Sequence, residues 1–162
     1  MLKGIPKNVS PDLLKILCEM GHGDEIVIAD GNFPAERCGQ RVVRADASGG
    51  AEMLESVLTL IPLDTYAEQN FILMQLSGND TVEPPIWSEY QSIAVKLDDN
   101  VRLGQIDRFT FYERAKAAFA VIATGEEATY ANIILKKGYK GIKEEAEAKL
   151  AELDKNDIEN FD

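Results

Sequence analysis

The sequence of 162 residues is poor in side chains that bind metals, with one histidine and two cysteines. These are too few for a Cys/His zinc cluster, an HExxH helix or a CxxC pair. A P-loop and a glycine-rich dinucleotide fingerprint are also missing, so we expect no metal and no nucleotide cofactor. We expect no disulfide between Cys18 and Cys38, because a domain of this length can bury enough apolar surface without one.

Positive charge and long apolar runs are scarce as well. Seventeen Lys and Arg stand against twenty-eight Asp and Glu, which gives a formal net charge of −11 at pH 7. This charge repels a phosphate backbone, so nucleic acid is not an expected partner. No run approaches the roughly 18 apolar residues of a membrane span, and residues 1–6 lack the apolar core of a signal peptide. We therefore expect a cytoplasmic protein with no membrane partner.

Helical and strand patterns alternate along the chain, which favours a single layered α/β domain with a central sheet flanked by helices. Ser10 and Pro11 mark the first helix, because a hydroxyl caps free N–H groups and proline fits the first turn; Gly21 is expected to end it. Apolar periodicity predicts further helices over 51–60, from Pro84 through Val95, and over 108–118. Strands are predicted over 25–30, 41–44, 71–76, 119–124 and 130–135.

The composition changes near residue 140. Residues 140–162 contain four lysines and eight acidic residues. A thin apolar stripe recurs there at helical spacing, at Ile142, Ala146, Leu150 and Leu153. We interpret residues 1–139 as the folded domain and residues 140–162 as an acidic, helical C-terminal tail.

The single histidine, His22, lies in the segment Met20-Gly21-His22-Gly23-Asp24, between the first helix and the first strand. Glycines on both sides leave the imidazole sterically open, so His22 is a candidate acid/base group. The alternative is a loop histidine without a chemical role, beside a glycine that only ends the helix.

Four other polar residues complete a candidate site: Asp30, Arg108, Tyr130 and Asn132. Asp30 ends the first strand and Arg108 begins a helix, while Tyr130 and Asn132 are two residues apart on a predicted strand and so share one face. Neutral donors and acceptors, an aromatic ring and an imidazole suit an uncharged, hydroxyl-rich ligand such as a sugar. Structural explanations stay open: Asp30 could shape the next turn, and Arg108 could form a surface ion pair.

Several segments carry a resemblance to a known family: Leu14 through Ile26, Asp30 through Ala35, Arg108 through Ala115, and Thr124 through Gly138. In order and spacing they resemble the fucose mutarotase branch of the ribose pyranase / fucose mutarotase family, over residues 1 to about 139. The run that begins at Arg108 favours the fucose branch. A histidine is expected in this region of the ribose branch, and the sequence has no second one.

The resemblance implies an α/β fold assembled into a ring-forming homo-oligomer, commonly a decamer, in which a neighbouring subunit completes each sugar site. It implies that residues 1–139 are a sugar mutarotase domain with a monosaccharide substrate. It assigns acid/base catalysis to His22, and it assigns sugar contacts to Asp30, Arg108, Tyr130 and Asn132. The tail after Gly138 departs from the usual pattern of the family.

The expected activity is interconversion of the α and β anomers of L-fucose, or of a close aldose, through the open-chain aldehyde. The reaction delivers a proton to the ring oxygen and removes one from the anomeric hydroxyl, and an imidazole can do both near neutral pH. Tyr130 or Tyr112 is a candidate for a second acid/base group. The alternatives are a ribose pyranase-type isomerase, a non-catalytic sugar-binding or transport-associated protein, and an oligomeric scaffold.

Overall fold

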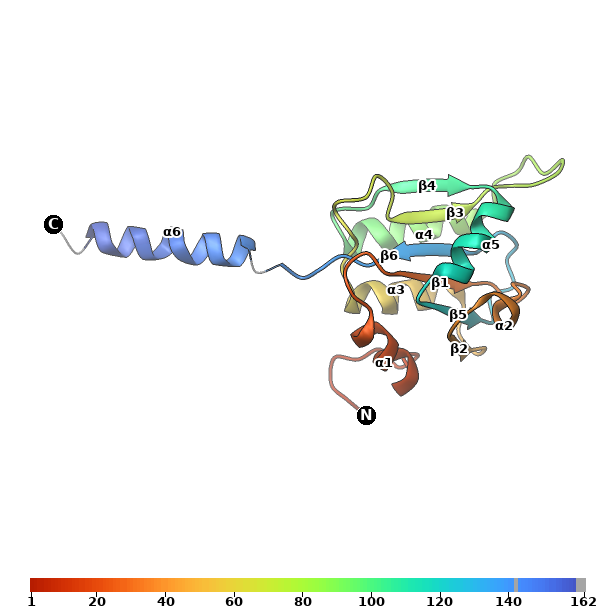
Figure 1. Cartoon of the computed structure of the whole chain (residues 1–162), viewed down its shortest axis with the longest axis horizontal. Coiled ribbons are helices and arrows are strands. Elements are labelled where there is room, and N and C mark those ends of the chain that lie inside the picture. The colour runs from red at the N-terminus through yellow and green to blue at the C-terminus, as the bar shows by residue number, and fades with distance from the viewer. Residues whose placement is uncertain (142, 160–162) are drawn as a thin grey trace.

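A six-stranded mixed sheet forms the centre of the molecule, in the order β2-β5-β1-β6-β3-β4 (Figure 1). The computed structural model describes residues 1–141 and 143–159. The strands are β1 (Glu25–Ala29), β2 (Val42–Ala45), β3 (Phe71–Met74), β4 (Leu103–Ile106), β5 (Ala120–Thr124) and β6 (Ile133–Lys136). β6 is antiparallel to both its neighbours, β1 and β3, whereas the other pairs are parallel. The sheet flanked by helices confirms the predicted fold class.

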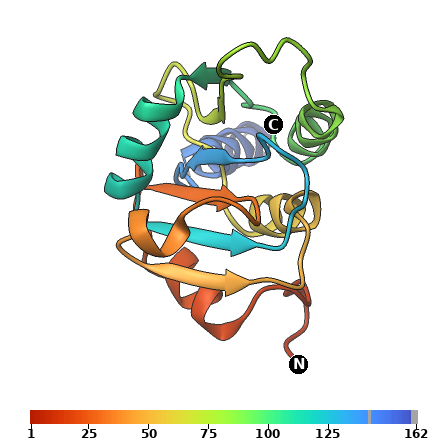
Figure 2. The same ribbon diagram turned by 90° about the vertical axis from the view of Figure 1, so that its right-hand side faces the viewer.

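Helices cover both faces of this sheet (Figure 2). The helices against the sheet are α1 (Pro11–Glu19), α2 (Ala35–Cys38), α3 (Gly50–Leu60), α4 (Pro85–Leu97) and α5 (Arg108–Ala117), and a further helix is α6 (Lys143–Glu159). Because successive strand residues point to opposite faces, Ile26 and Ile28 pack with α1, α3 and α4. Val27 and Ala29 pack with α2 and α5 on the other face. Buried apolar residues on both sides of β1 make it a fully covered central strand.

The first helix starts as the sequence predicts and ends earlier. The Ser10 hydroxyl accepts the backbone N–H of Leu13 at 3.1 Å, and Pro11 occupies the first turn. The helix ends at Glu19 rather than at Gly21, and Gly23 is the glycine in this loop with a positive φ, of 87°. Cys18 and Cys38 are both free cysteines, the first exposed and the second buried.

Three elements differ from the sequence expectations. The short helix α2 and the edge strand β4 were not predicted, because α2 is a single turn and residues 103–106 show no apolar alternation. The last strand of the sheet begins at Ile133 rather than at Tyr130. Tyr130 lies in a turn with a φ of 55°, in the left-handed region, so Tyr130 and Asn132 do not share a strand.

α6 lies apart from the sheet in Figure 1, at the end of an extended segment. Leu150 and Leu153 of the predicted apolar stripe are exposed. Ile142 and residues 160–162 lie outside the described residues. Among the helices of the described residues, none has the length and apolar character needed to cross a membrane.

Two aromatic side chains of α4 hold the segment that enters β6. Trp87 donates from Nε1 to the carbonyl oxygen of Tyr130 at 2.7 Å, and Tyr90 donates from Oη to that of Ala131 at 3.0 Å. Tyr90 is fully buried and contacts the start of α3 at Gly50. A Cβ added at Gly50 would lie 1.9 Å from Tyr90 Oη. α3 therefore needs glycine there so that Tyr90 can reach the carbonyl of Ala131, just before β6.

Gly50→Ala is expected to lower the free energy of unfolding by about 1–3 kcal/mol, because Tyr90 must move away from the Ala131 carbonyl to make room. Urea unfolding measures this loss. The matched control is Gly49→Ala, whose Cβ would meet Glu126 Oε2 at an ordinary 3.4 Å and whose expected cost is under about 1 kcal/mol. Equal stability of the two variants would contradict the proposed contact.

Candidate functional site

Asp30 and Asn132 bond reciprocally where β1 ends and β6 begins. The backbone N–H of Asp30 donates to Asn132 Oδ1 at 2.8 Å, and Asn132 Nδ2 donates to Asp30 Oδ2 at 3.1 Å. Both residues are buried, with 7% and 5% of their surface exposed. Buried polar groups are costly unless bonded, and this pair satisfies each with the other.

The carboxyl group of Asp30 is electrostatically perturbed. Burial raises its pKa above the ordinary value, and hydrogen bonds from Asn32 and Asn132 offset only part of that effect. The N–H of Asn32 donates to Asp30 Oδ1 at 3.0 Å, which is the turn-shaping role that the sequence left open. Asp30 therefore shapes the turn and also presents its carboxyl group just beyond the carboxyl end of the central strand β1.

Tyr130 reaches the same end of the sheet from its left-handed turn. The Tyr130 hydroxyl donates to the carboxylate of Asp80, and Ser77 Oγ lies 3.2 Å from the Tyr130 hydroxyl oxygen. The backbone N–H of Ser77 donates to the same hydroxyl at 3.3 Å. The loop between β3 and α4 thus holds the phenol in one position.

A hollow of about 490 Å³ opens between these groups. It is lined by Asp30, Asn32, Phe33, Met74, Ser77, Asp80, Arg108, Tyr112, Thr129, Tyr130 and Asn132. The structure thus brings together four of the five residues predicted from the sequence, at the carboxyl ends of the parallel strands. Carboxylate, amide, phenol and guanidinium groups around one hollow can bind several hydroxyls of an uncharged ligand. We call this hollow the Asp30 pocket.

Arg108 and Tyr112 enter the Asp30 pocket from the first turns of α5, where Asp107 caps the helix by accepting the N–H of Thr110 at 3.0 Å. The guanidinium carbon of Arg108 lies 5.3 Å from the ring centroid of Phe109. Arg108 is exposed, so its charge stays hydrated beside the opening.

His22, the fifth predicted residue, lies at the other end of β1. The loop that contains His22 precedes Glu25, whereas Asp30 follows Ala29, and the five residues of the strand span roughly 16 Å. A single chain therefore does not bring His22 to the Asp30 pocket.

Around His22 the chain gathers a second set of polar and aromatic groups. His22 Nε2 lies 2.9 Å from Asp64 Oδ1. The rings of Tyr66 and Tyr139 each have their centroids 5.3 Å from that of His22. Lys137 anchors the loop, because its N–H donates to Asp24 O and its carbonyl accepts from Gly23 N–H, each at 2.8 Å. We call His22, Asp64, Tyr66 and Tyr139 the His22 cluster.

Sequence reasoning missed Asp64 and Tyr66 of the His22 cluster, and Ser77 and Asp80 of the Asp30 pocket. Asp64 follows the apolar segment 60–63, and an acidic residue there is a signal that could have been noticed. The others lie in loops without periodicity, so only tertiary contacts reveal them.

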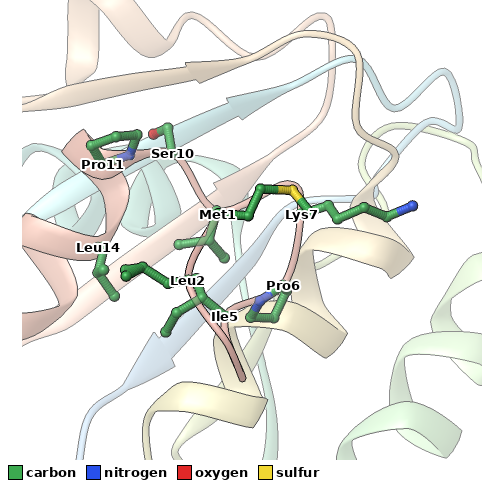
Figure 3. A pocket seen from close by; sticks show the side chains of 9 residues that line it. Met1, Leu2, Ile5, Pro6, Lys7, Ser10, Pro11 and Leu14 are labelled. Carbon is green, nitrogen blue, oxygen red and sulfur yellow. The ribbon is translucent and has the colours of Figure 1, made fainter.

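A second hollow, of about 380 Å³, lies beside the N-terminal segment (Figure 3). Its lining is almost wholly apolar, from residues such as Leu2, Ile5 and Leu14, with Lys7 as its charged member. None of the predicted site residues lines it. The candidate functional site is therefore the Asp30 pocket together with the His22 cluster.

A profile of the RbsD / FucU transport protein family matches residues 3–140. This chain belongs to that family. The resemblance drawn from the sequence motifs is thereby confirmed. The fucose mutarotase of Mus musculus is 52% identical over an alignment 143 residues long, which covers 85% of this chain and 94% of the mouse protein.

Two bacterial members of the RbsD/FucU family are similar over the same region. The L-fucose mutarotase of Histophilus somni (strain 2336) is 48% identical over 144 residues, which are 88% of this chain and 100% of that protein. A crystal structure of the fucose mutarotase from Streptococcus pneumoniae in complex with L-fucose matches with a TM-score of 0.82 at 46% identity. That match covers 86% of this chain and 100% of the other.

Asn132→Ala is expected to lower the free energy of unfolding by about 1–3 kcal/mol, because the buried N–H and carboxylate of Asp30 both lose their partner. The loss should grow with pH. A carboxyl whose pKa is raised by folding favours the folded state most at low pH, and this contribution is lost as pH rises through the raised pKa. Without the hydrogen bond from Asn132, the ionised form of Asp30 is even less favoured in the folded state. The loss of stability caused by Asn132→Ala is therefore larger at about pH 7 than at about pH 4.

Urea unfolding at both pH values measures the Asn132→Ala effect. The control is Asn100→Ala, which removes an exposed asparagine side chain and should change stability by less than about 0.5 kcal/mol. A cost for Asn132→Ala that matches this control, or that does not vary with pH, would contradict the role given to the Asp30 pair.

Proposed function

We propose that this protein is a mutarotase that interconverts the α and β anomers of L-fucose by general acid/base catalysis. One observation carries the proposal: the polar Asp30 pocket lies in a chain that aligns over nearly the full length of fucose mutarotases at 48–52% identity. One such relative has been solved with L-fucose. A pocket of neutral and charged hydrogen-bonding groups suits the hydroxyls of that sugar.

Asp30, Arg108, Tyr130 and Asn132 hold the sugar hydroxyls in this proposal, and His22 moves the proton. Ring opening removes a proton from the anomeric hydroxyl and delivers one to the ring oxygen. Tyr130 and Tyr112 both line the Asp30 pocket and are the candidates for the second acid/base group. No oxidation, reduction or covalent intermediate enters the chemistry, so the residues of the chain suffice.

The complete site would require two copies of the chain. His22 and the Asp30 pocket lie at opposite ends of β1, and both are open to solvent, so the His22 cluster of one copy can close the pocket of the next. A closed ring of copies satisfies every such head-to-tail contact. We propose a ring-forming homo-oligomer, with the decamer as the expected size.

We further propose that residues 1–139 form the sugar mutarotase domain and that residues 140–162 are a separate acidic helical tail. The exposed residues of α6 support this division. A cytoplasmic location is proposed as well, because free cysteines such as the exposed Cys18 persist in a reducing compartment.

Exchange of the anomeric protons of L-fucose, followed by NMR, tests the activity directly. The unmodified chain should accelerate the exchange, and His22→Ala should reduce it by at least about 100-fold. Lys15→Ala, which changes an exposed residue of α1, should leave it unaltered. Full exchange in His22→Ala would remove the imidazole from the mechanism.

A panel of L-fucose, D-ribose and other aldoses in the same spectra separates the competing functions. Faster exchange of ribose than of fucose would indicate a pyranase-type isomerase. Binding without any faster exchange would indicate a non-catalytic sugar-binding protein.

Complementation between inactive variants tests the shared site. Co-expressed His22→Ala and Arg108→Ala chains should recover about one quarter of the sites, because half the pockets and half the histidines are intact and they meet at random. If His22 and Arg108 served a site within one copy, mixed oligomers would recover no activity. Sedimentation of each variant verifies that the oligomer persists.

A further inference from the structure

We propose that Glu126 is a positioning residue for the sugar. Glu126 does not line the Asp30 pocket, but it holds together the two turns that carry Asp30 and Tyr130. The consequence for sugar binding rests on the proposed function. The structural part, a carboxylate that joins these turns to the start of α3, stands on the contacts of Glu126 alone.

Both carboxylate oxygens of Glu126 accept backbone N–H groups, and the two donors belong to different elements. Oε2 accepts the N–H of Gly50 at 2.9 Å, and Oε1 accepts that of Ala128 at 3.0 Å. Gly50 is the first residue of α3, and Ala128 directly precedes the pocket residues Thr129 and Tyr130. The carboxylate therefore joins the first turn of a helix to the segment from which Tyr130 enters the pocket.

The start of α3 lacks a side-chain acceptor of its own. The first N–H groups of a helix have no partner within the helix, and the side chain of the N-cap residue commonly accepts one of them. The N-cap residue here is Gly49, which has no side chain to do so. Glu126 supplies the acceptor from 76 residues beyond Gly50, and its negative charge lies beside the positive end of the helix dipole. The contact therefore stabilises the start of α3 as well as the turn.

The backbone of Glu126 holds the turn that follows Asp30. Its carbonyl oxygen accepts the N–H of Gly31 at 2.8 Å, and a Cβ added at Gly31 would lie 3.1 Å from that oxygen, so the two turns are in direct contact. The N–H of Glu126 donates to Thr124 Oγ1 at 3.2 Å. The same hydroxyl donates at 2.6 Å to the carbonyl oxygen of Ala29, the last residue of β1. A shift of Glu126 is therefore transmitted to both turns.

The turn at Tyr130 needs such support because its backbone conformation is unfavourable. The φ of 55° lies in the left-handed region, which is disfavoured for residues with a Cβ and persists only where surrounding contacts hold it. Trp87 holds the carbonyl oxygen of Tyr130 itself, and Glu126 holds the preceding segment through Ala128. Without the carboxylate of Glu126, we expect this segment to move and the pocket groups to match the sugar hydroxyls less well.

Hydrogen–deuterium exchange tests the structural part. In the unmodified protein the N–H groups of Gly50 and Ala128 should be protected, because both are hydrogen-bonded to Glu126. In Glu126→Ala both should exchange faster by at least about tenfold. Glu127→Ala is the matched control, because it removes the neighbouring exposed carboxylate, and it should leave both rates unchanged. Unprotected N–H groups in the unmodified protein, or equal rates in Glu126→Ala, would overturn the assignment whatever the activity.

The kinetics of fucose exchange test the positioning role. Poorer alignment of the pocket weakens sugar binding, so Glu126→Ala should raise KM by at least about tenfold and change kcat by less than about threefold. A variant that is only less stable contains fewer active molecules, which lowers the apparent kcat and leaves KM unchanged. Glu126→Gln should have an intermediate KM, because the amide oxygen still accepts one N–H whereas the amide nitrogen accepts none. Glu127→Gln should leave both constants unchanged.

Two results distinguish the role of Glu126 from the fucose activity. An unchanged KM in folded Glu126→Ala, whether or not kcat falls, overturns the positioning role while the activity stands. An unmodified protein with protected N–H groups but without fucose exchange refutes the proposed function and leaves the contacts of Glu126 intact. Circular dichroism verifies folding, and if Glu126→Ala fails to fold, the KM of Glu126→Gln against that of Glu127→Gln decides the matter.

Discussion

The arrangement of the Asp30 pocket depends on the reciprocal hydrogen bonds between Asp30 and Asn132. They join the end of β1 to the start of β6 at the centre of the sheet, in a place where neither polar group could be buried alone. This contact lies at the start of β6. Hydrogen bonds from Trp87 and Tyr90 of α4 to the carbonyl oxygens of Tyr130 and Ala131 hold the segment that leads into the strand. Just before this contact, Tyr130 lies in a left-handed turn with its hydroxyl against the β3–α4 loop. The hydrogen bonds that join β1 to the start of β6 therefore also position the residues of the Asp30 pocket.

The antiparallel strand β6 links the two parts of the candidate site. Its start carries Asn132 at the Asp30 pocket, and the residues after its end carry Lys137 and Tyr139 at the His22 cluster. A strand is stiff and of set length, so the two ends stay apart at a fixed distance. In the proposed ring this separation becomes useful, since each copy offers an acid/base group on one side and a sugar pocket on the other.

The helices and central strands could be predicted because their signals are local. Ser10 caps the first helix as its hydroxyl suggested, and the apolar run at Phe71 forms a buried strand. Edge strand β4 escaped prediction because Leu103-Gly-Gln-Ile has no apolar alternation and pairs only on one side. The start of β6 was misplaced because Tyr130 has high strand propensity, which the bonds from Trp87 and Tyr90 to the following turn override.

Family membership, the α/β class and four residues of one pocket were determined by the sequence alone, because motif identity, capping and periodicity act over a few neighbouring residues. Asp64 beside His22 and Asp80 beside Tyr130 are separated in sequence by 42 and 50 residues, and no local pattern connects them. Only the tertiary structure decided those contacts, and with them the distance between His22 and the pocket. The physical reason is that strand order and direction, which place distant segments together, follow from packing of the whole sheet rather than from any one segment.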